Sequence, residues 1–277
     1  MNSMAGKAIP PYAKKALGQN FLVDLNIVRK IIRLAGFDKD DIVVELGVGQ
    51  GALTRILAHN VSKVIGLEKD IELVEWLIHS GTLPENVEIR KADMLEVSYR
   101  ELSKEIGRKL KLIGNLPYNI SSPLLFKIID ERVAIEEAVL MFQKEVAARI
   151  TAVPGTKAYG VLSIVVQECA SVTHLMDVPP QAFRPVPKVT SSVLKLRFKQ
   201  EKLRTKDFIL FKALVKKAFQ KRRKVLINAL EGFKGLKKEQ IRELMESCNI
   251  DSGLRPEDLS VHDFEKFANC LKDFVDK

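Results

Sequence analysis

The residues best suited to chemistry form a short run, Asn115-Leu116-Pro117-Tyr118, at the end of an apolar segment of strand length. Asn115 offers a side-chain carbonyl, and Pro117 restricts Leu116 to an extended backbone that can aim the Leu116 carbonyl at a ligand. Tyr118 offers a flat face on which a base stacks. Two acceptors beside a ring suit an exocyclic amino group of a nucleobase, which they would position for attack on an electrophilic carbon. In most proteins an isolated Asn-x-Pro-Tyr motif is an ordinary turn. The functional interpretation therefore depends on the position of this motif at the end of a predicted strand.

A second group of residues could hold a cofactor. The segment Glu45–Gly51 follows a strand pattern and carries Gly47, where the chain turns sharply and its backbone can approach a ligand. Glu68 ends the next strand, 21 residues after Gly47, where an acidic side chain can accept from ribose hydroxyls. Asp93, after the third strand, could accept from an adenine amino group, although such a residue is more often a cap or turn. The glycines also fit the dinucleotide fingerprint or a tight turn without a ligand, so the loop alone does not name the cofactor.

The elements that must position these residues alternate along the first two-thirds of the chain. The expected strands are Ile42–Leu46, Lys63–Leu67, Val87–Lys91, Leu110–Gly114 and Ala138–Phe142. The expected helices are Leu53–Asn60, Ile71–His79, Tyr99–Gly107 and Pro123–Glu131, and two later strands, Val172–Val178 and Ser192–Phe198, are expected as an antiparallel pair at the edge. Alternating strands and helices predict an α/β fold with a doubly wound, mostly parallel sheet.

The pattern changes near residue 200. Apolar residues at helical spacing predict one long amphipathic helix over Phe208–Leu230, followed by helices over Lys237–Asn249 and Ser260–Val275. We therefore expect two domains, a cofactor-binding catalytic domain over residues 1–200 and a small all-helical domain over residues 201–277.

The positive charge of the chain is local. The net charge is +10, yet residues 184–224 alone hold 15 basic residues against Glu201 and Asp207. An isolated charge run is usually a solvated helix face. A strongly basic segment in an otherwise near-neutral chain instead favours a polyphosphate partner, whose condensed counterions Lys and Arg displace.

Several other classes of protein are disfavoured. The three cysteines, Cys169, Cys248 and Cys270, lie far apart, which argues against a disulfide scaffold or a cysteine zinc site and fits a reducing compartment. The four histidines do not cluster, so we expect no metal. The sequence has no apolar run of membrane-spanning length and no secretory leader, so we expect no membrane association and a cytoplasmic location.

With these motifs in place, the chain resembles the small-subunit branch of the ribosomal RNA adenine N6,N6-dimethyltransferases, which use S-adenosylmethionine. The resemblance covers nearly the whole sequence and is carried by Leu17–Leu22, Glu45–Gly51, Asn115–Ser121, Tyr159–Ser163, Phe183–Val189 and Phe219–Lys224, together with Glu68 and Asp93. It implies a Rossmann-like methyltransferase sheet and methylation of two adjacent adenosines in a hairpin loop near the 3′ end of small-subunit rRNA. The expected substrate is that rRNA within a partly assembled subunit, and the expected enzyme is a monomer with a role in subunit biogenesis.

The resemblance also implies roles for particular residues. The cofactor would be bound by Asn20, Leu22, Gly47, Glu68, Asp93 and Asn115. The catalytic set would be Asn115, Leu116, Tyr118 and Phe183, with Tyr118 and Phe183 stacking on the two faces of the flipped adenine. The RNA would be contacted by Arg184, Lys188, Lys217, Lys221, Arg222, Arg223 and Lys224.

Three alternatives remain at this point. A non-catalytic RNA-binding assembly factor would explain the basic segment but would not need an intact Asn115 and glycine loop. A large-subunit rRNA adenine dimethyltransferase shares the tetrapeptide, although the segments after residue 180 favour the small-subunit branch. A nicotinamide-dependent reductase fits only the glycine loop.

Overall fold

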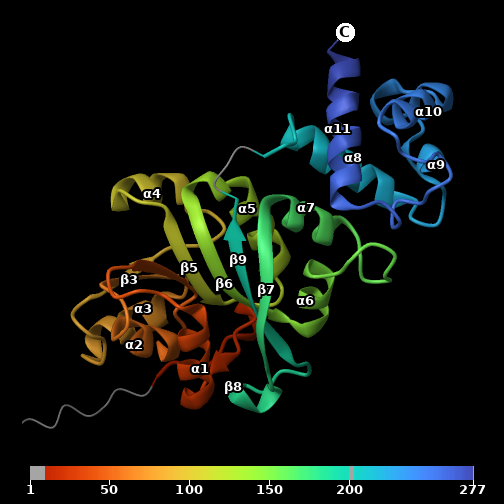
Figure 1. The fold of residues 1–277 in the computed structure, drawn as a ribbon. Coiled ribbons are helices and arrows are strands. Elements are labelled where there is room, and N and C mark those ends of the chain that lie inside the picture. Colours follow the sequence, from red (N-terminus) through yellow and green to blue (C-terminus); the bar gives the residue numbers. More distant parts are fainter. Residues whose placement is uncertain (1–9, 200–202, 277) are drawn as a thin grey trace, which may run out of the picture. The chain divides into compact units, whose positions relative to one another are not determined.

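The computed structural model describes residues 10–199 and 203–276. Its main sheet has seven strands in the order β4-β3-β2-β5-β6-β9-β7 (Figure 1). The strands are β2 (Ile42–Leu46), β3 (Lys63–Glu68), β4 (Val87–Lys91), β5 (Leu110–Asn115), β6 (Ile135–Gln143), β7 (Ala170–Val178) and β9 (Ser191–Phe198). Neighbouring strands from β4 to β6 are parallel, and β9 is antiparallel to β6. The predicted doubly wound, mostly parallel sheet with its late antiparallel strands is confirmed.

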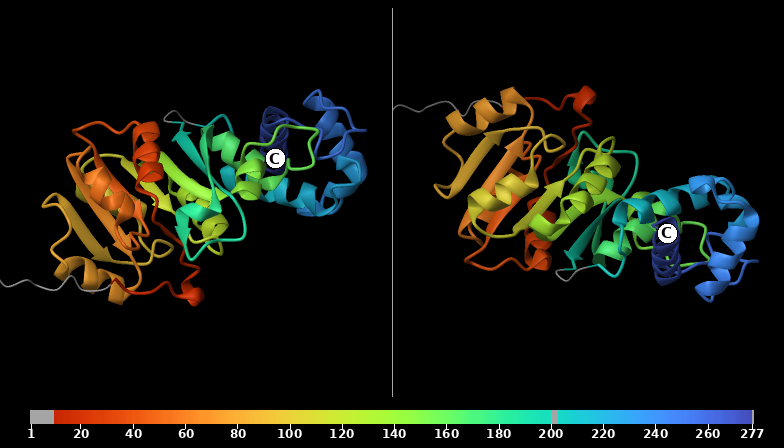
Figure 2. Two further views of the ribbon diagram at one scale, coloured as in Figure 1. Left: turned by 90° about the horizontal axis from the view of Figure 1, so that it is seen from below. Right: turned by 90° about the horizontal axis from the view of Figure 1, so that it is seen from above.

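Helices cover both faces of this sheet (Figure 2). They are α1 (Leu25–Ala35), α2 (Ala52–Ala58), α3 (Ile71–His79), α4 (Tyr99–Ile106), α5 (Ser121–Asp130) and α6 (Lys144–Ile150). Short polar side chains begin several of them: Asp24 accepts from the backbone N–H groups of Asn26 and Ile27, and Ser98 accepts from that of Glu101. The central strands β2, β3, β5, β6 and β9 are mostly buried, which is why they are rich in apolar residues, whereas the edge strands β4 and β7 are partly exposed.

A small second sheet ties the N-terminal arm to a distant segment. β1 (Phe21–Leu22) pairs antiparallel with β8 (Phe183–Arg184), in the register Phe21 opposite Arg184 and Leu22 opposite Phe183. The N–H of Val23 also donates to the Ala182 carbonyl over 2.8 Å. Two segments that the sequence analysis singled out separately are therefore one structural feature.

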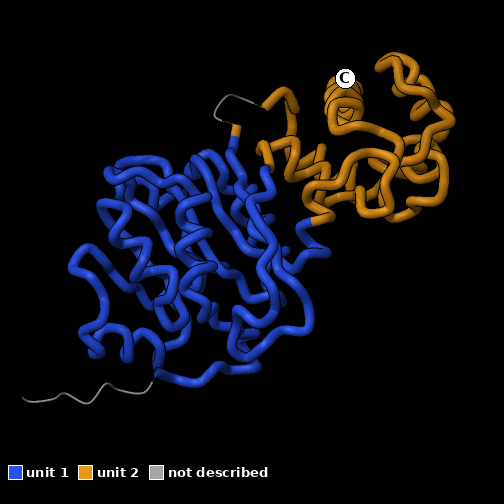
Figure 3. Tube along the Cα trace, turned by 60° about the horizontal axis from the view of Figure 1, so that its bottom comes forward, with its two compact units in different colours: residues 1–147, 173–198 blue, residues 148–172, 199–277 orange. Residues whose placement is uncertain are grey.

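The chain forms two compact units (Figure 3). The first holds residues 1–147 and 173–198, and the second holds residues 148–172 and 199–277. The expected division between residues 200 and 201 falls outside the described residues and stays a prediction. The expected division assigned residues 148–172, which include α7 (Val161–Cys169), to the first domain, whereas in the structure they belong to the second unit. In the second unit α7 packs against the C-terminal helices, with the Tyr159 ring edge-on to Phe219.

The prediction of one long helix over Phe208–Leu230 is wrong. The structure has α8 (Phe208–Gln220), a turn, and the short helix α9 (Leu226–Leu230). Within the turn the N–H of Lys224 donates to the Lys221 carbonyl, and the N–H of Leu226 donates to the Leu254 carbonyl. Helical periodicity continued across the break because apolar residues on both sides of it pack into the same core.

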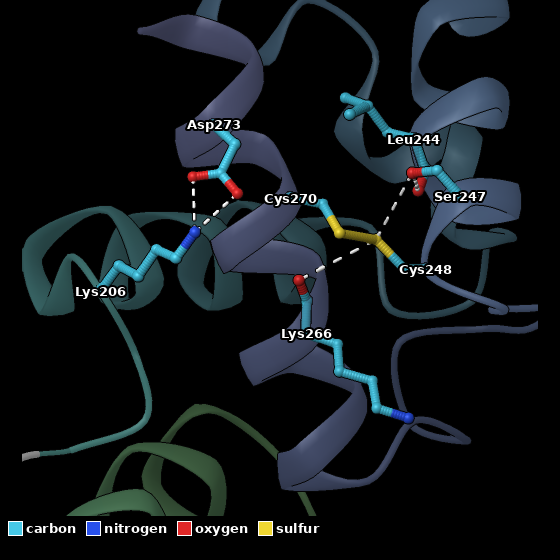
Figure 4. The surroundings of a disulfide bond; sticks show 7 residues. All are labelled: Lys206, Leu244, Ser247, Cys248, Lys266, Cys270 and Asp273. Carbon is cyan, nitrogen blue, oxygen red and sulfur yellow. Dashed lines mark hydrogen bonds and ion pairs between the residues drawn. A yellow bond between two sulfur atoms is a disulfide. The ribbon is translucent and has the colours of Figure 1, made fainter.

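The remaining helices of the second unit are α10 (Lys238–Ser247) and α11 (Val261–Val275). A disulfide joins Cys248, at the end of α10, to Cys270 on α11 (Figure 4). Nearby, the Lys206 ammonium donates to both carboxylate oxygens of Asp273 over 2.6 Å. The spacing of the cysteines argues against a disulfide scaffold, but helix packing brings these two together although they are 22 residues apart.

Candidate functional site

The chemistry-bearing loops meet at the carboxyl edge of the parallel strands. Leu46 lies opposite Leu67 in the β2–β3 register, and Glu45 lies opposite Ile113 in the β2–β5 register, so these strands end side by side. The N–H of Gly47 donates to the Leu67 carbonyl over 2.9 Å, which fixes the first turn of the glycine loop against β3. This edge is where open α/β sheets place their ligands.

A cavity opens at this edge within the first unit. Its lining comes from the N-terminal arm, the glycine loop, the ends of β3 and β4, and the segment after β5. It includes the predicted residues Asn20, Leu22, Gly47, Glu68, Asp93, Asn115, Leu116 and Tyr118. The structure thus brings all six predicted cofactor-binding residues, and three of the four predicted catalytic residues, to one place.

The backbone of the glycine loop disfavours other residues at three of its positions. Gly47, Gly49 and Gly51 have φ of 77°, 56° and 76°, in the left-handed region that L-residues rarely adopt. A Cβ at Gly49 would lie 3.0 Å from the Phe21 ring, and one at Gly47 would lie 3.2 Å from the Met94 methyl group. The N–H of Gly49 donates to Glu68 Oε2 over 2.9 Å. The loop is therefore shaped by the arm, by β3 and by the segment after β4 together.

Glu68 is held in place by backbone donors. Its Oε2 accepts from Gly49, its Oε1 accepts from the N–H of Asp70 over 2.9 Å, and the residue is only 6% exposed. Burial raises the pKa of Glu68, although these backbone hydrogen bonds oppose the shift. The carboxylate is thus oriented in advance, as a group that binds ribose hydroxyls must be.

Glu45 is a buried carboxyl to which we assigned no role from the sequence. It lines the cavity, is 1% exposed, and its Oε2 has no hydrogen-bond partner among the described residues. Burial raises the pKa of Glu45 to about 8; the neighbouring Thr54 hydroxyl opposes the shift, although it does not reach hydrogen-bond geometry. The site therefore contains a buried carboxyl oxygen whose hydrogen-bonding capacity is unmet among the described residues.

Asp93 is already engaged on both oxygens. Its Oδ2 accepts from the Lys69 ammonium over 2.6 Å, and its Oδ1 accepts from the N–H of Leu95 over 2.9 Å. Each oxygen has a second lone pair, so Asp93 can still accept from a base. Lys69 is a cavity residue that sequence reasoning missed, because nothing in the chain distinguishes it from other surface lysines.

The end of β5 is built into the centre of the sheet. A Cβ at Gly114 would lie 2.7 Å from the Leu46 carbonyl oxygen, so only glycine lets β5 lie this close to β2. The Asn115 side-chain nitrogen donates to the Asn20 carbonyl over 2.9 Å. That bond fixes the orientation of the amide, so Asn115 Oδ1, the acceptor atom of the side chain, is held on the opposite side, where it could accept from a substrate amine. Tyr118 is half-buried, and its hydroxyl is hydrogen-bonded to Ser191 Oγ over 2.7 Å.

The N-terminal arm forms one wall of the cavity and is attached through Asp70. Asp70 Oδ1 accepts from the Lys14 ammonium over 2.8 Å, and Oδ2 accepts from the Gln19 side chain over 3.2 Å. Asp70 also caps α3 by accepting from the N–H of Glu72. Its position just before Ile71 reveals the helix cap in the sequence, but nothing in the sequence links it to Lys14.

Phe183 does not lie where the predicted adenine sandwich requires it. The residue is fully buried in the hydrophobic core, together with Leu22, Val178 and Ala182, and is not among the described residues that line the cavity. Its pairing with Leu22 across β1 and β8 turns the side chain into the core. In this structure Phe183 holds the arm, and the aromatic residues that line the cavity are Tyr118 and Phe21.

The predicted RNA-binding residues fall into different settings. Arg184 and Lys188 are exposed on the first unit, and on the second unit Lys221, Arg223 and Lys224 are exposed while Lys217 is half-buried. Arg222 instead binds within the second unit. Its guanidinium pairs with Glu257 and donates to the carbonyls of Lys157 and Thr156. One residue of the basic run, Arg222, therefore stabilises the second unit itself, which a count of charges along the sequence cannot reveal.

Neither a metal centre nor a membrane-spanning element is apparent in the part of the chain that the structure describes. Over these residues, no group of three or more His, Cys, Asp or Glu side chains is placed to hold a metal ion. Over the same residues, no helix is both long enough and apolar enough to cross a bilayer.

The strand order, the glycine loop and the acidic end of β3 define a Rossmann-like methyltransferase fold. Residues 12–273 match the family model described as ribosomal RNA adenine dimethylase. The chain belongs to the ribosomal RNA adenine dimethylase family.

Named relatives agree with this assignment. Ribosomal RNA small subunit methyltransferase A of Francisella tularensis is 43% identical over 259 residues, covering 94% of this chain and 97% of the relative. The protein of the same name from Alkaliphilus metalliredigens is 43% identical over 263 residues, covering 94% and 91%. The crystal structure of a dimethyladenosine transferase from Plasmodium falciparum superimposes with a TM-score of 0.76 at 29% identity, covering 92% of this chain and 98% of that one.

Proposed function

We propose that this protein transfers methyl groups from S-adenosylmethionine to the N6 amines of two adjacent adenosines near the 3′ end of small-subunit rRNA. The observation that carries the proposal is the place of Asn115–Tyr118, which line the same cavity as the glycine loop, Glu68 and Asp93. Two relatives named as small-subunit methyltransferases favour that subunit over the large one. Family membership replaces the reductase interpretation of the glycine loop.

The lining of the cavity supports the proposed cofactor. Gly47 and Gly49 carry no Cβ, so a ligand can approach the backbone of the loop closely, and Glu45 Oε2 has no partner among the described residues and can form a hydrogen bond with a polar group. Asn20, Leu22, Gly47, Glu68, Asp93 and Asn115 would hold the cofactor, with Glu68 at the ribose and Asp93 at the adenine. When bound, S-adenosylmethionine supplies a methyl group on a positively charged sulfur, which leaves readily.

The residues of the tetrapeptide would act on the target amine by positioning it. Asn115 Oδ1 and the Leu116 carbonyl would accept the two amine hydrogens, which draws the nitrogen lone pair out of conjugation and directs it at the methyl carbon. After transfer the nitrogen loses one proton and becomes neutral again. Tyr118 would stack on the flipped base, which must leave its helix or stack before it can reach the cavity.

Exposed basic residues on both units would bind the RNA backbone. Arg184, Lys188, Lys221, Arg223 and Lys224 are free to contact phosphates without giving up a described salt bridge, whereas Arg222 is not. We infer that the enzyme acts as a monomer on a partly assembled subunit in the cytoplasm. The basic surface also suits the alternative of an assembly factor without catalysis, which the test below separates.

The test is methyl transfer to defined acceptors. The protein is incubated with labelled S-adenosylmethionine and unmethylated small subunits, large subunits or free rRNA, and the labelled nucleotides are identified. We expect N6,N6-dimethyladenosine in small-subunit rRNA alone. Label in the large subunit would favour the large-subunit alternative, and RNA binding without label would favour the assembly factor.

Asn115→Ala tests the chemical role of the tetrapeptide. We expect it to lower methyl transfer about a hundredfold or more while RNA affinity is kept. Asn60→Ala is the matched control, because Asn60 also donates one side-chain hydrogen bond to a carbonyl, that of Ile56, but lies on the surface at the end of α2. Equal loss of RNA affinity and activity in Asn115→Ala would mean that Asn115 is only structural.

A further inference from the structure

The Tyr118 side chain extends from the cavity wall to a residue on a strand of the main sheet. Its ring lines the cavity, but its hydroxyl is hydrogen-bonded to Ser191 Oγ over 2.7 Å. Ser191 is not among the described residues that line the cavity. The bond therefore connects a ring proposed to contact substrate with a residue that does not touch substrate.

Ser191 is a rigid anchor. It is the first residue of β9, lies opposite Gln143 in the β6–β9 register, and is fully buried. Tyr118 lies on a loop closed by the hydrogen bond from the Ile120 N–H to the Pro117 carbonyl. A loop residue gains a fixed side-chain direction when its far end is bonded to a sheet, because the ring then loses its freedom to swing about χ1.

We propose that Ser191 is a positioning residue for methyl transfer, which holds the Tyr118 ring at the angle that stacks on the target base. The inference rests on the proposed function and deepens it. It also gives the segment over residues 183–191 a role in the site: β8 at its start binds the N-terminal arm, and Ser191 at its end holds Tyr118.

The chemistry of the pair suits a lasting contact. Burial raises the pKa of the Tyr118 phenol, so the group stays protonated and neutral at physiological pH. A neutral phenol and a serine hydroxyl can each donate or accept, so the bond does not depend on pH in the working range.

Ser192 provides a matched control on the same strand. It is as buried as Ser191, and its hydroxyl also makes one side-chain hydrogen bond, to Asp177 Oδ1 over 2.7 Å. Because successive side chains of a strand point to opposite faces, Ser192 cannot reach Tyr118. Ser191→Ala and Ser192→Ala therefore lose comparable contacts, and only the first should alter the site.

The test is a double-mutant cycle between Ser191→Ala and Tyr118→Phe, with methyl transfer to small subunits as the readout. Each single variant should lower kcat/KM for the RNA about two- to tenfold, the effect of one hydrogen bond. If Ser191 acts through the phenol, the double variant should be no worse than Tyr118→Phe alone. Ser191→Thr should restore the rate, and the dissociation constant of S-adenosylmethionine should stay within twofold in every variant.

The proposal would be overturned by multiplicative losses in the double variant, by an unchanged rate in Ser191→Ala, or by an equal loss in Ser192→Ala. Wild-type protein is assayed in parallel. If it transfers no methyl group to small subunits, the proposed function fails; if it does and the losses multiply, only the role of Ser191 fails.

Discussion

Asp70→Asn should release the N-terminal arm without disturbing the helix that Asp70 begins. In the structure Oδ1 accepts from Lys14 and from the N–H of Glu72, and Oδ2 accepts from Gln19. Asparagine caps helices as well as aspartate does, so its one oxygen can keep the α3 cap. Its amide NH₂ then faces the Gln19 NH₂, and two donors cannot bond. Gln19 cannot simply flip, because its own oxygen accepts from the backbone N–H of Lys14 over 2.7 Å.

The size of the effect follows from that lost bond. Losing one hydrogen bond to a buried carboxylate, with a donor left unsatisfied, costs about 1–2 kcal/mol. The opening of the arm should therefore become about five- to thirtyfold more frequent. Burial works against ionisation of Asp70, yet the bonds from Lys14, Gln19 and Glu72 hold its pKa below the usual value. Because a lowered carboxyl pKa stabilises the fold above the unfolded-state pKa, the attachment is complete at neutral pH and is lost only in acid.

Limited trypsin digestion measures this opening directly, since the arm carries adjacent cleavage sites after Lys14 and Lys15. When opening is fast relative to cleavage, the rate follows the population of the open arm. Mass spectrometry should show faster cleavage there in Asp70→Asn, and S-adenosylmethionine should bind more weakly because the arm lines the cavity. Glu72→Gln is the control, because Glu72 also pairs with Lys14 but is 61% exposed, so its loss should matter little. Cleavage at the wild-type rate, or an equal increase in Glu72→Gln, would refute the role assigned to Asp70.

Two further predictions concern other buried or clamped charges. Glu45→Gln should flatten the pH dependence of stability. In the wild-type protein the folded-state pKa of Glu45, about 8, lies above its unfolded-state value. The wild-type free energy of unfolding should therefore fall by up to ~4 kcal/mol as the pH rises from 5 to 8, and that of the variant should not. Urea unfolding at both pH values would show no such difference between the two proteins if Glu45 stays ionised. Arg222→Ala should destabilise the second unit by about 2 kcal/mol, because the pair with Glu257 and the bonds to two carbonyls are lost. Arg223→Ala removes an exposed side chain and should leave stability unchanged. It should instead reduce the slope of log K for RNA binding against log salt concentration by about 1. Thermal unfolding and binding at several salt concentrations would reveal the reverse pattern if Arg222 contacts RNA instead.

The sheet and most of the cavity could be predicted from the sequence because both depend on local signals. Buried parallel strands read as short apolar runs, and their carboxyl ends must meet at one edge. The glycine loop, Glu68 and Asn115 each directly follow or end such a strand. A correct prediction of the strands therefore also predicts where these residues lie.

The sequence failed where a side chain's role depends on a partner distant in the chain. Arg222 looked like one more cation of a basic run, but its guanidinium holds Glu257 and two carbonyls. Phe183 belongs to a segment typical of the family, yet its ring fills the core beneath β1. Neither burial nor pairing at such separations leaves a periodic signal in the sequence.

The two positioning residues share a structural logic. Asp70 stands at the first turn of α3 and holds the arm, while Ser191 stands at the first residue of β9 and holds Tyr118. The start of a regular element is a fixed point, because the hydrogen bonds that follow leave its backbone little freedom. The cavity is lined largely by loops, which are otherwise free to move. Attaching the arm and the Tyr118 loop to such fixed points lets the loop-borne part of the lining stay ordered beside Glu68 and Asn115, which lie at the ends of strands. It follows that substitutions at Asp70 and Ser191 should alter the site while leaving the sheet intact.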